Sequence, residues 1–456
     1  MPTLADALTD PVAIAADDML QRFRSPARLI CALSGGSDST GLLRALHAAL
    51  PRHPGLSLEA CTIDHGLRPA SADEARAMAA LCAQLGIAHH IRRWEGEKPA
   101  SGLQAAARLA RYRLLVDVAQ ARDAQAILSG HTANDQAETI AMRSLRSAPG
   151  QPGLAGMAPA VLLFGQVWLL RPFLPLSRAQ IRLYLQSLGQ AFIDDPSNDN
   201  PRFERVRLRQ SMEPACLQPR PFFPFSKASD RAASGARIAA LMGEEAASVG
   251  EGILRLSPRL CASAGEDDTA RAIALLAAAM GGKAMPVGRE TMGRVATFLQ
   301  GGMPGRMTAS GVVFDRRREG LFLYREARDL PVTRLLSGQE ALWDGRYHVR
   351  NLGAAPLVLS SGGDAASLSL GHAGTDIADA VPKGVVRRAA RAALRLSFAD
   401  DRPVTRDMVV VRPALTLYDT FLPCFDRMIA DQIAILIGCE RYIRVPLTDL
   451  LQSGPW

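Results

Sequence analysis

The chain has few lysines, no closely paired cysteines and no long apolar runs. The last two absences each exclude classes of protein. Its seven cysteines are scattered with no CxxC pair, so we expect neither a disulfide framework nor a structural zinc site nor an iron–sulfur cluster. No apolar run is long enough to cross a bilayer, and the first twenty residues carry acids where a signal peptide carries basic residues. We therefore expect a cytoplasmic protein that does not bind membranes.

Arginine carries nearly all of the positive charge, because only four lysines occur in 456 residues. The formal net charge of +8 favours a polyanionic partner such as nucleic acid. An arginine-rich coding bias would give the same composition, so the charge alone leaves both explanations open.

The hydrophobic pattern of residues 1–215 predicts an α/β domain with a Rossmann-like parallel sheet. Short apolar runs alternate there with amphipathic stretches, which is typical of parallel strands covered by helices. The expected strands are 28–33, 56–64, 88–94 and 124–130. The stretch 71–86 is expected to be a helix that opens with a capping box formed by Ser71 and Glu74.

Closely spaced prolines between residues 211 and 230 forbid a long helix or an inner strand and mark a domain boundary. We expect a mainly helical middle domain over 216–330, with a hairpin that turns near Arg317 to Gly320. A small α+β domain is expected over 331–456. Its stretch 385–398 is expected to be helical.

The stretch SGGSDS, residues 34–39, lies between an apolar run and an amphipathic helix. Adjacent glycines let backbone N–H groups approach an anion, and the N-terminus of the helix adds partial positive charge. An ordinary turn with Asp38 or Ser39 as N-cap would have the same composition. No GxxxxGK[ST] lysine is present, so we expect a grip on pyrophosphate during attack at the α-phosphate, with Asp38 holding Mg²⁺.

Further polar residues follow two other expected strands. In GHTANDQAET a helix starts near Ala133, so Asp135 and Glu138 share a face that suits a metal ion or a lysine ammonium group. Acids favoured by the helix dipole are the structural alternative. His131 and His65 each end an expected strand, at the edge where open α/β sheets bind ligands.

These motifs together resemble a known family. SGGSDS is similar to the motif of the PP-loop ATP pyrophosphatases, which adenylate a carbonyl or carboxyl group. Four more stretches over about the first 210 residues resemble, in order and spacing, the tRNA(Ile)-lysidine synthetase family: TIDHGLRPASADEA (62–75), LQAAARLARYRLL (103–115), SGHTANDQAETIAMRSLR (129–146), and the RPFLPLSRAQIRLYLQSLG to RVRLR region (171–209).

The resemblance implies an ATP- and Mg²⁺-dependent ligase. Members of the family adenylate the C2 carbonyl of the wobble cytidine in an isoleucine tRNA with a CAU anticodon, and free L-lysine then displaces AMP. The expected partners are therefore this tRNA, lysine and ATP, and the resemblance leaves a homodimer open.

The resemblance also assigns roles to residues of this chain that match the family's motifs. The expected catalytic residues are Asp38, His131, Asp135 and Glu138, and the expected metal ligands are Asp38 and Asp135. The expected ATP-binding residues are Ser34, Gly35, Gly36, Ser37, Asp38, Ser39, Ile63, His65 and Arg108. The expected tRNA contacts are Arg111, Arg205, Arg207, Arg387 and Arg391, the last two on one face of the expected helix that also carries Arg395.

Two positions depart from the family's pattern: Ala148 stands where its first loop glycine is expected, and Val206 where an asparagine is usual. Two other functions remain as alternatives. A tRNA thiolase of the cluster-dependent type would need the paired cysteines that are missing here, and a catalytically silent nucleotide-dependent RNA-binding protein would not need Asp38, Asp135 and Glu138.

Overall fold

The computed structural model describes most of the chain in two compact units. The described residues are 9–67, 70–145, 156–194, 207, 223–362, 381–398 and 404–448, with the backbone alone for 223–228. Unit 1 comprises Met1–Ala232, Phe421–Phe425 and Ile443–Trp456, and unit 2 comprises Ala233–Thr420 and Asp426–Tyr442. Arg205, Ala148, Val206 and the prolines between 211 and 222 lie outside the described residues.

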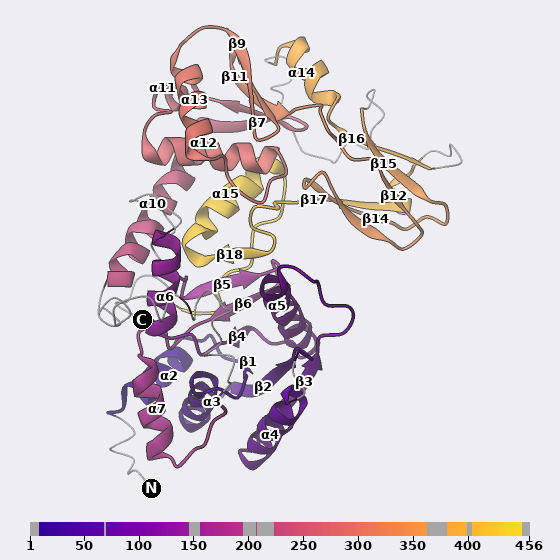
Figure 1. The fold of residues 1–456 in the computed structure, drawn as a ribbon. Coiled ribbons are helices and arrows are strands. Elements are labelled where there is room, and N and C mark those ends of the chain that lie inside the picture. Colours follow the sequence, from indigo (N-terminus) through magenta and orange to yellow (C-terminus); the bar gives the residue numbers. More distant parts are fainter. Residues whose placement is uncertain are drawn as a thin grey trace. The chain divides into compact units, whose positions relative to one another are not determined.

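Unit 1 is built on a seven-stranded sheet with the order β18-β5-β6-β4-β1-β2-β3 (Figure 1). The neighbours from β6 to β3 pair in parallel, while β5 and β18 run antiparallel to the strands beside them. The bounds are β1 Ala27–Ala32, β2 Leu56–Asp64, β3 Ala88–Arg93, β4 Ala126–Leu128, β5 Ala160–Leu163, β6 Val167–Leu170 and β18 Phe421–Pro423. The predicted parallel sheet is confirmed.

One helix precedes β1, and the others follow strands at points where the hydrophobic period changes. They are α2 Pro11–Gln21, α3 Ser37–Ala49, α4 Ser71–Gln84, α5 Leu103–Ala121, α6 Ala133–Ser144 and α7 Arg178–Ser187. Helix α3 buries Leu42, Leu43 and Leu46 completely, as its period predicts. The Ser71–Glu74 capping box is wrong, because Ala70 is the N-cap of α4 and the Ser71 hydroxyl donates to Asp64 instead.

The last part of the chain completes the sheet of unit 1. Strand β18 pairs with the edge strand β5, with Leu422 opposite Leu162 and fully buried. The indole N–H of Trp168 in β6 donates to the carbonyl of Ile443 at 3.2 Å, and the backbone N–H of Thr448 donates to the Arg22 carbonyl at 2.8 Å. The edge strand of this sheet therefore comes from a segment that lies between the two sequence segments of unit 2.

Unit 2 combines helices with a five-stranded antiparallel sheet of order β7-β8-β11-β10-β9. The boundary between the units, at Ala232 and Ala233, falls within α10 Phe223–Glu245. The elements that follow are β7 Ala246–Gly250, β8 Ile253–Leu256, α11 Pro258–Ala262, α12 Asp267–Met280, α13 Arg289–Gln300, β9 Gly305–Ala309, β10 Val312–Arg317 and β11 Gly320–Arg325. Arg317 pairs with Gly320 at the turn between β10 and β11, so the predicted hairpin is confirmed.

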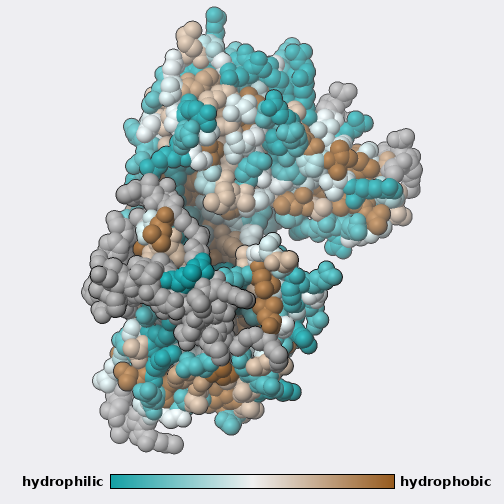
Figure 2. Space-filling model, in the orientation of Figure 1, coloured by the Kyte–Doolittle hydropathy of each residue, from teal (hydrophilic) through white to brown (hydrophobic). Residues whose placement is uncertain are grey.

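The rest of unit 2 contains two three-stranded sheets, β12-β15-β16 and β13-β14-β17. The elements are β12 Thr333–Leu335, β13 Glu340–Trp343, β14 Tyr347–Asn351, β15 Leu357–Ser361, α14 Lys383–Ala390, β16 Leu394–Phe398, β17 Val409–Pro413 and α15 Arg427–Ile437. Figure 2 shows apolar side chains among polar ones on this part, and exposed Leu336, Leu342 and Leu352 belong to it. No helix within the described ranges is long and apolar enough to span a membrane.

The expectation of one helix over 385–398 is partly wrong. Helix α14 ends at Ala390, and residues 394–398 form β16, paired with β15. Leu394 and Phe398 are buried in a core with Trp343 and Val349, and polar residues alternate with apolar ones between them. Burial of one face of a strand therefore overrides helix propensity in this stretch. Arg395 consequently lies on a strand and does not share a helix face with Arg387 and Arg391.

The buried side chain of β18 provides a test of its role in unit 1. Leu422→Ala should lower the free energy of unfolding of unit 1 by about 2–4 kcal/mol, because it leaves a cavity at the sheet edge. Hydrogen exchange of the β5 and β6 amides in the full chain measures this loss. Leu183→Ala, at a side chain of α7 that is 64% exposed, is the control and should change exchange little. Unchanged protection of β5 in Leu422→Ala would contradict the role of β18.

Candidate active site

The loop between β1 and α3 leaves its backbone N–H groups available at the start of the helix. Gly36 is the N-cap of α3 and no side chain caps it, so the structure excludes Asp38 and Ser39 as N-caps. The Ser39 hydroxyl bonds within the loop, to the Ser34 N–H at 3.1 Å, the Ser34 hydroxyl at 3.0 Å and the Gly36 carbonyl at 3.2 Å. This arrangement suits an anion.

Two glycines let the loop pack closely against its neighbours. Gly35 has φ +88°, and a Cβ there would lie 2.7 Å from Ile193 Cδ1. A Cβ at Gly130, in the segment after β4, would lie 2.6 Å from the Asp38 carbonyl oxygen. The end of β4 can therefore approach the start of α3 only because residue 130 has no side chain.

Arg178, the first residue of α7, connects the two acidic positions of the site. Its Nε lies 3.0 Å from Asp38 Oδ2, and its Nη2 lies 3.5 Å from Asp135 Oδ1. Burial alone would lower the pKa of the Arg178 guanidinium, but the charges of Asp38 and Asp135 raise it above its ordinary value. The Asn134 side chain also accepts a hydrogen bond from the Arg178 N–H at 2.9 Å.

The two carboxylate oxygens of Asp135 make different contacts. Oδ2 accepts from the N–H and hydroxyl of Thr132, both at 2.9 Å, which completes a capping box at the start of α6. Oδ1 is the oxygen that faces Arg178. The structure therefore shows the helix-terminal role of Asp135 and its ion pair with Arg178, while its role towards a metal ion or lysine stays a prediction.

Glu138 and His131 lie on the same segment as Asp135. Glu138 is 3% exposed, and its charge acts on Arg178. The Nδ1 atom of His131 lies 2.9 Å from the Ser129 hydroxyl. The structure thus brings the loops after β1 and β4 and the start of α7 together, as expected for the carboxyl edge of a parallel sheet.

His65 follows β2 and is held neutral. Burial, followed by the charge of Arg111, lowers its pKa to about 4, with Asp64 acting in the opposite direction. Its Nδ1 is buried with no hydrogen-bond partner among the described residues, and its ring meets Trp94 edge-on at 6.3 Å. Ile63, half-buried in β2, lies two residues earlier.

The arginines expected to bind ligands are spread over both units. Arg108 stacks over the Tyr112 ring at 4.9 Å, while Arg111 is exposed on the same helix. Exposed Arg207 lies in unit 1, and exposed Arg387 and Arg391 lie on α14 and at its C-cap in unit 2. Sequence reasoning missed Arg178; only the adjacent helix cap at Ser177 hinted at its position.

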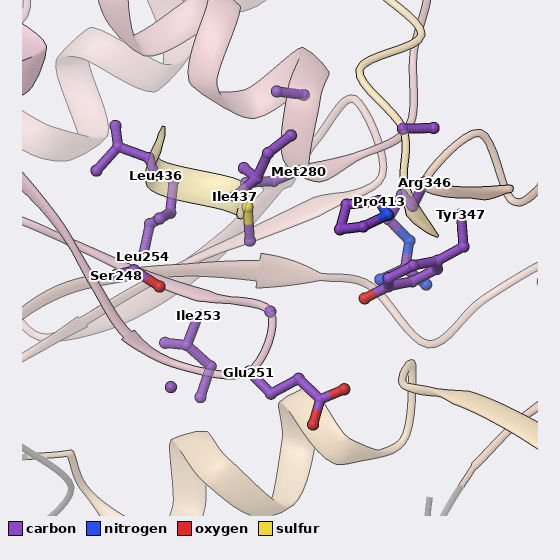
Figure 3. A pocket seen from close by; sticks show the side chains of 14 residues that line it. Ser248, Glu251, Ile253, Leu254, Met280, Arg346, Tyr347, Pro413, Leu436 and Ile437 are labelled. Atoms are coloured by element: carbon purple, nitrogen blue, oxygen red, sulfur yellow. The ribbon is translucent and has the colours of Figure 1, made fainter. Parts of the chain in front are cut away.

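A pocket in unit 2 contains none of these residues. It is lined by apolar side chains of β8, α12 and α15 together with polar groups, and Figure 3 shows the Glu251 carboxylate and the Tyr347 ring at it. Burial raises the pKa of the Tyr347 phenol. The chemistry expected from the sequence concentrates instead at the sheet edge of unit 1, so we place the candidate site there.

Comparisons with known proteins identify the class and then the family. A family model of the PP-loop domain matches residues 9–216, as a glycine loop between β1 and α3 of a parallel sheet suggests. The chain is 44% identical over 450 residues to the tRNA(Ile)-lysidine synthase of Rhizobium meliloti, covering 96% of this chain and 97% of that protein. It is 37% identical over 437 residues to the tRNA(Ile)-lysidine synthase of Mesorhizobium japonicum, covering 92% of this chain and 94% of that protein.

A solved U34-tRNA thiolase from Methanococcus maripaludis is also similar, with a TM-score of 0.38 and 16% identity over 45% of this chain and 74% of that one. The chain belongs to the tRNA(Ile)-lysidine synthase family, whose members are ATP-using PP-loop ligases. The family resemblance and the fold class expected from the sequence are thereby confirmed.

The lowered pKa of His65 predicts a pH effect on stability. The folded pKa of about 4 lies below the ordinary 6.5, so the unfolded chain binds the extra proton first. The contribution of His65 is complete above pH 6.5 and is lost as the pH falls from 6.5 towards 4. Nuclear magnetic resonance titration of His65 should find it neutral at pH 5, and His65→Gln should flatten the pH dependence in that window. A measured pKa at or above 6.5 would contradict this account.

Arg178 is expected to stabilise the unliganded site through its ion pairs with Asp38 and Asp135. Arg178→Met should lower the free energy of unfolding of unit 1 by about 1–3 kcal/mol, because two acids lose their shared cation. Denaturant titration measures this. Adding Asp38→Asn to the variant should recover part of the loss, since one of the two unpaired charges is removed.

Arg182, one turn later on α7, offers a matched control. Its ion pair with Asp194 is 46% and 73% exposed, so Arg182→Met should cost less than about 1 kcal/mol. Equal losses for the two arginines would show that Arg178 is an ordinary surface residue.

Proposed function

We propose that this chain ligates free L-lysine to C2 of the wobble cytidine in an isoleucine tRNA with a CAU anticodon. The proposal is supported by family membership together with one observation, the convergence of Asp38 and Asp135 on Arg178 beside the uncapped start of α3. Acids and an anion-binding helix end at one sheet edge suit a reaction between a nucleotide triphosphate and a cationic amine.

The first step is adenylation of the base. The C2 carbonyl oxygen of cytidine attacks the α-phosphorus of ATP, and the bond to the bridging oxygen of pyrophosphate breaks. The loop 34–39 binds the pyrophosphate through backbone N–H groups and serine hydroxyls, so the leaving group is stabilised where its charge develops. His131 after β4 and His65 after β2, the two strands that flank β1, contact the nucleotide, and neutral His65 acts without a charge of its own.

The second step forms the new C–N bond. A lysine amine attacks C2, and AMP leaves with the oxygen that was the carbonyl. Asp135 and buried Glu138 attract the lysine ammonium group, and this pair of carboxylates accepts the proton that the amine loses. Arg178 keeps the carboxylates of Asp38 and Asp135 oriented towards the reacting groups.

The donor set also fits Mg²⁺, a hard cation that prefers carboxylate and phosphate oxygens. Asp38 and Asp135 already face one cation, and they would hold the metal. No group of three or more metal-binding side chains occurs within the part of the chain that the structure describes, so the remaining ligands would come from phosphates and water. When bound, the ion supplies neutralisation of phosphate charge.

We further propose that residues 216–330 and 331–456 contact the tRNA. Exposed Arg387 and Arg391 suit phosphate contacts. Because β18 and Ile443 belong to the sheet of unit 1, deletion of 331–456 would also damage the catalytic unit. Substitution of these two arginines is therefore the cleaner test of tRNA binding.

Asp38→Asn tests the residue that the proposal places at the phosphates. Purified protein with ATP, Mg²⁺, labelled lysine and the CAU-anticodon isoleucine tRNA should release AMP and leave label in the RNA. Asp38→Asn should lower this rate at least about 100-fold while tRNA affinity is retained, because phosphate charge is no longer balanced. Exposed Asp73→Asn is the control and should remain active.

Two outcomes would contradict the proposal. Absence of label in the RNA at every protein concentration would refute lysine ligation. Normal activity of Asp38→Asn would refute the role of that carboxylate while leaving the reaction itself established.

A further inference from the structure

Two guanidinium groups hold one short backbone segment beside the candidate active site. The segment is residues 156–159. Arg143 Nη1 donates to the Gly156 carbonyl at 2.7 Å, and Arg171 Nη1 donates to the Ala158 carbonyl. Between them, the Gln136 side chain donates to the Met157 carbonyl at 3.0 Å. Arg143 and Arg171 are therefore neighbours along the same stretch of chain.

Arg171 is buried, and no acid among the described residues compensates its charge. It is 3% exposed, and its Nε is buried with no hydrogen-bond partner among the described residues. Arg108 stacks over Tyr112, whose phenol lies close enough to influence the charge of Arg171. Within the described ranges, neither Arg108 nor Arg171 forms an ion pair with a carboxylate.

The Ala158 carbonyl oxygen satisfies an N–H group of Arg171 but brings no negative charge. Burial lowers the pKa of Arg143, and the charges of Arg231, Arg108 and Arg171 lower it further. Burial likewise lowers the pKa of Arg171, with repulsion from Arg108 in the same direction. Like charges gathered away from water are costly, and a bound anion would offset that cost.

The position of this cluster relates it to the chemistry. Arg171 directly follows β6, and the Leu170 carbonyl before it accepts from the Ser129 N–H at the end of β4 at 2.9 Å. Arg143 lies on α6, whose first turns carry Asp135 and Glu138. The cluster thus lies at the same edge of the sheet as the loop 34–39, displaced along it towards β6.

We propose that Arg108, Arg143 and Arg171 form a phosphate site that takes a backbone phosphate of the RNA beside the reacting nucleotide. This proposal replaces the ATP contact that the family resemblance implies for Arg108 with a contact to RNA. The inference rests on the proposed function. Arginine forks match phosphate oxygens, whereas the ATP phosphates already have the N–H groups and hydroxyls of the loop 34–39. A phosphate held here would fix the position of the next base along the strand.

Salt-dependent binding distinguishes RNA phosphate from ATP phosphate. Arg108→Gln and Arg143→Gln should each weaken binding of the CAU-anticodon tRNA about 5- to 30-fold and reduce the slope of log affinity against log salt by about 0.9, with ATP affinity unchanged within about twofold. Arg171→Lys keeps the buried positive charge and should therefore retain the fold, but it removes the two-pronged guanidinium geometry that matches phosphate oxygens. Arg113→Gln is the matched control: Arg113 is also on α5 and stacks on Phe164 at 3.7 Å.

Neutral phosphates identify the contact. Anticodon stem-loop RNAs with a single methylphosphonate near the CAU triplet should show one position at which the neutral phosphate weakens binding to the wild type. At that position the same substitution should not weaken binding to Arg108→Gln or Arg143→Gln any further. Variants that weaken ATP instead of RNA, or that weaken neither, would overturn the proposal. These outcomes count against the phosphate site only if the wild-type protein binds and modifies the tRNA. A wild type that does neither would instead refute the proposed function.

Discussion

Arg178 lies between two carboxylates that come from separate loops, and the rest of the candidate site depends on this arrangement. Asp38 starts α3 after β1, and Asp135 starts α6 after β4, so the two acids approach each other only at the carboxyl edge of the sheet. Unpaired, they would repel each other in a partly buried setting. The guanidinium offsets this repulsion, and Gly130 supplies the space that allows the two segments to meet.

The same edge gathers charge of both signs. Carboxylates surround Arg178, whereas a second group of arginines lies towards β6. Arg143 and Arg171 of this group donate to backbone carbonyls, and Arg108 stacks over the Tyr112 ring. This separation is suited to a substrate that presents a cationic amine in one place and phosphates in another. Strand β18 forms the edge of the sheet next to β5, and Ile443 and Thr448 bond to Trp168 and Arg22, so late parts of the chain help to complete unit 1.

Much of this follows from local sequence. The strand bounds of β2, the start of α6 at Ala133 and the hairpin turn at Arg317–Gly320 depend on short-range patterns and are confirmed. Arg178 was missed because its partner Asp38 is 140 residues away, and β18 because strand addition from the end of the chain has no local signal. The helix extended to residue 398 failed because alanine-rich propensity was outweighed by burial of Leu394 and Phe398. The roles of the site residues remain predictions.

The central claim is that the loop 34–39 grips pyrophosphate while the α-phosphate is transferred to the RNA. The most direct measurement is to incubate the protein and the CAU-anticodon tRNA with ATP labelled at the α-phosphate, without lysine. The account predicts label bound to the RNA, released as AMP when lysine is added, and no RNA label from ATP labelled at the γ-phosphate. Formation of ADP, or transfer of the γ-label to the RNA, would contradict it.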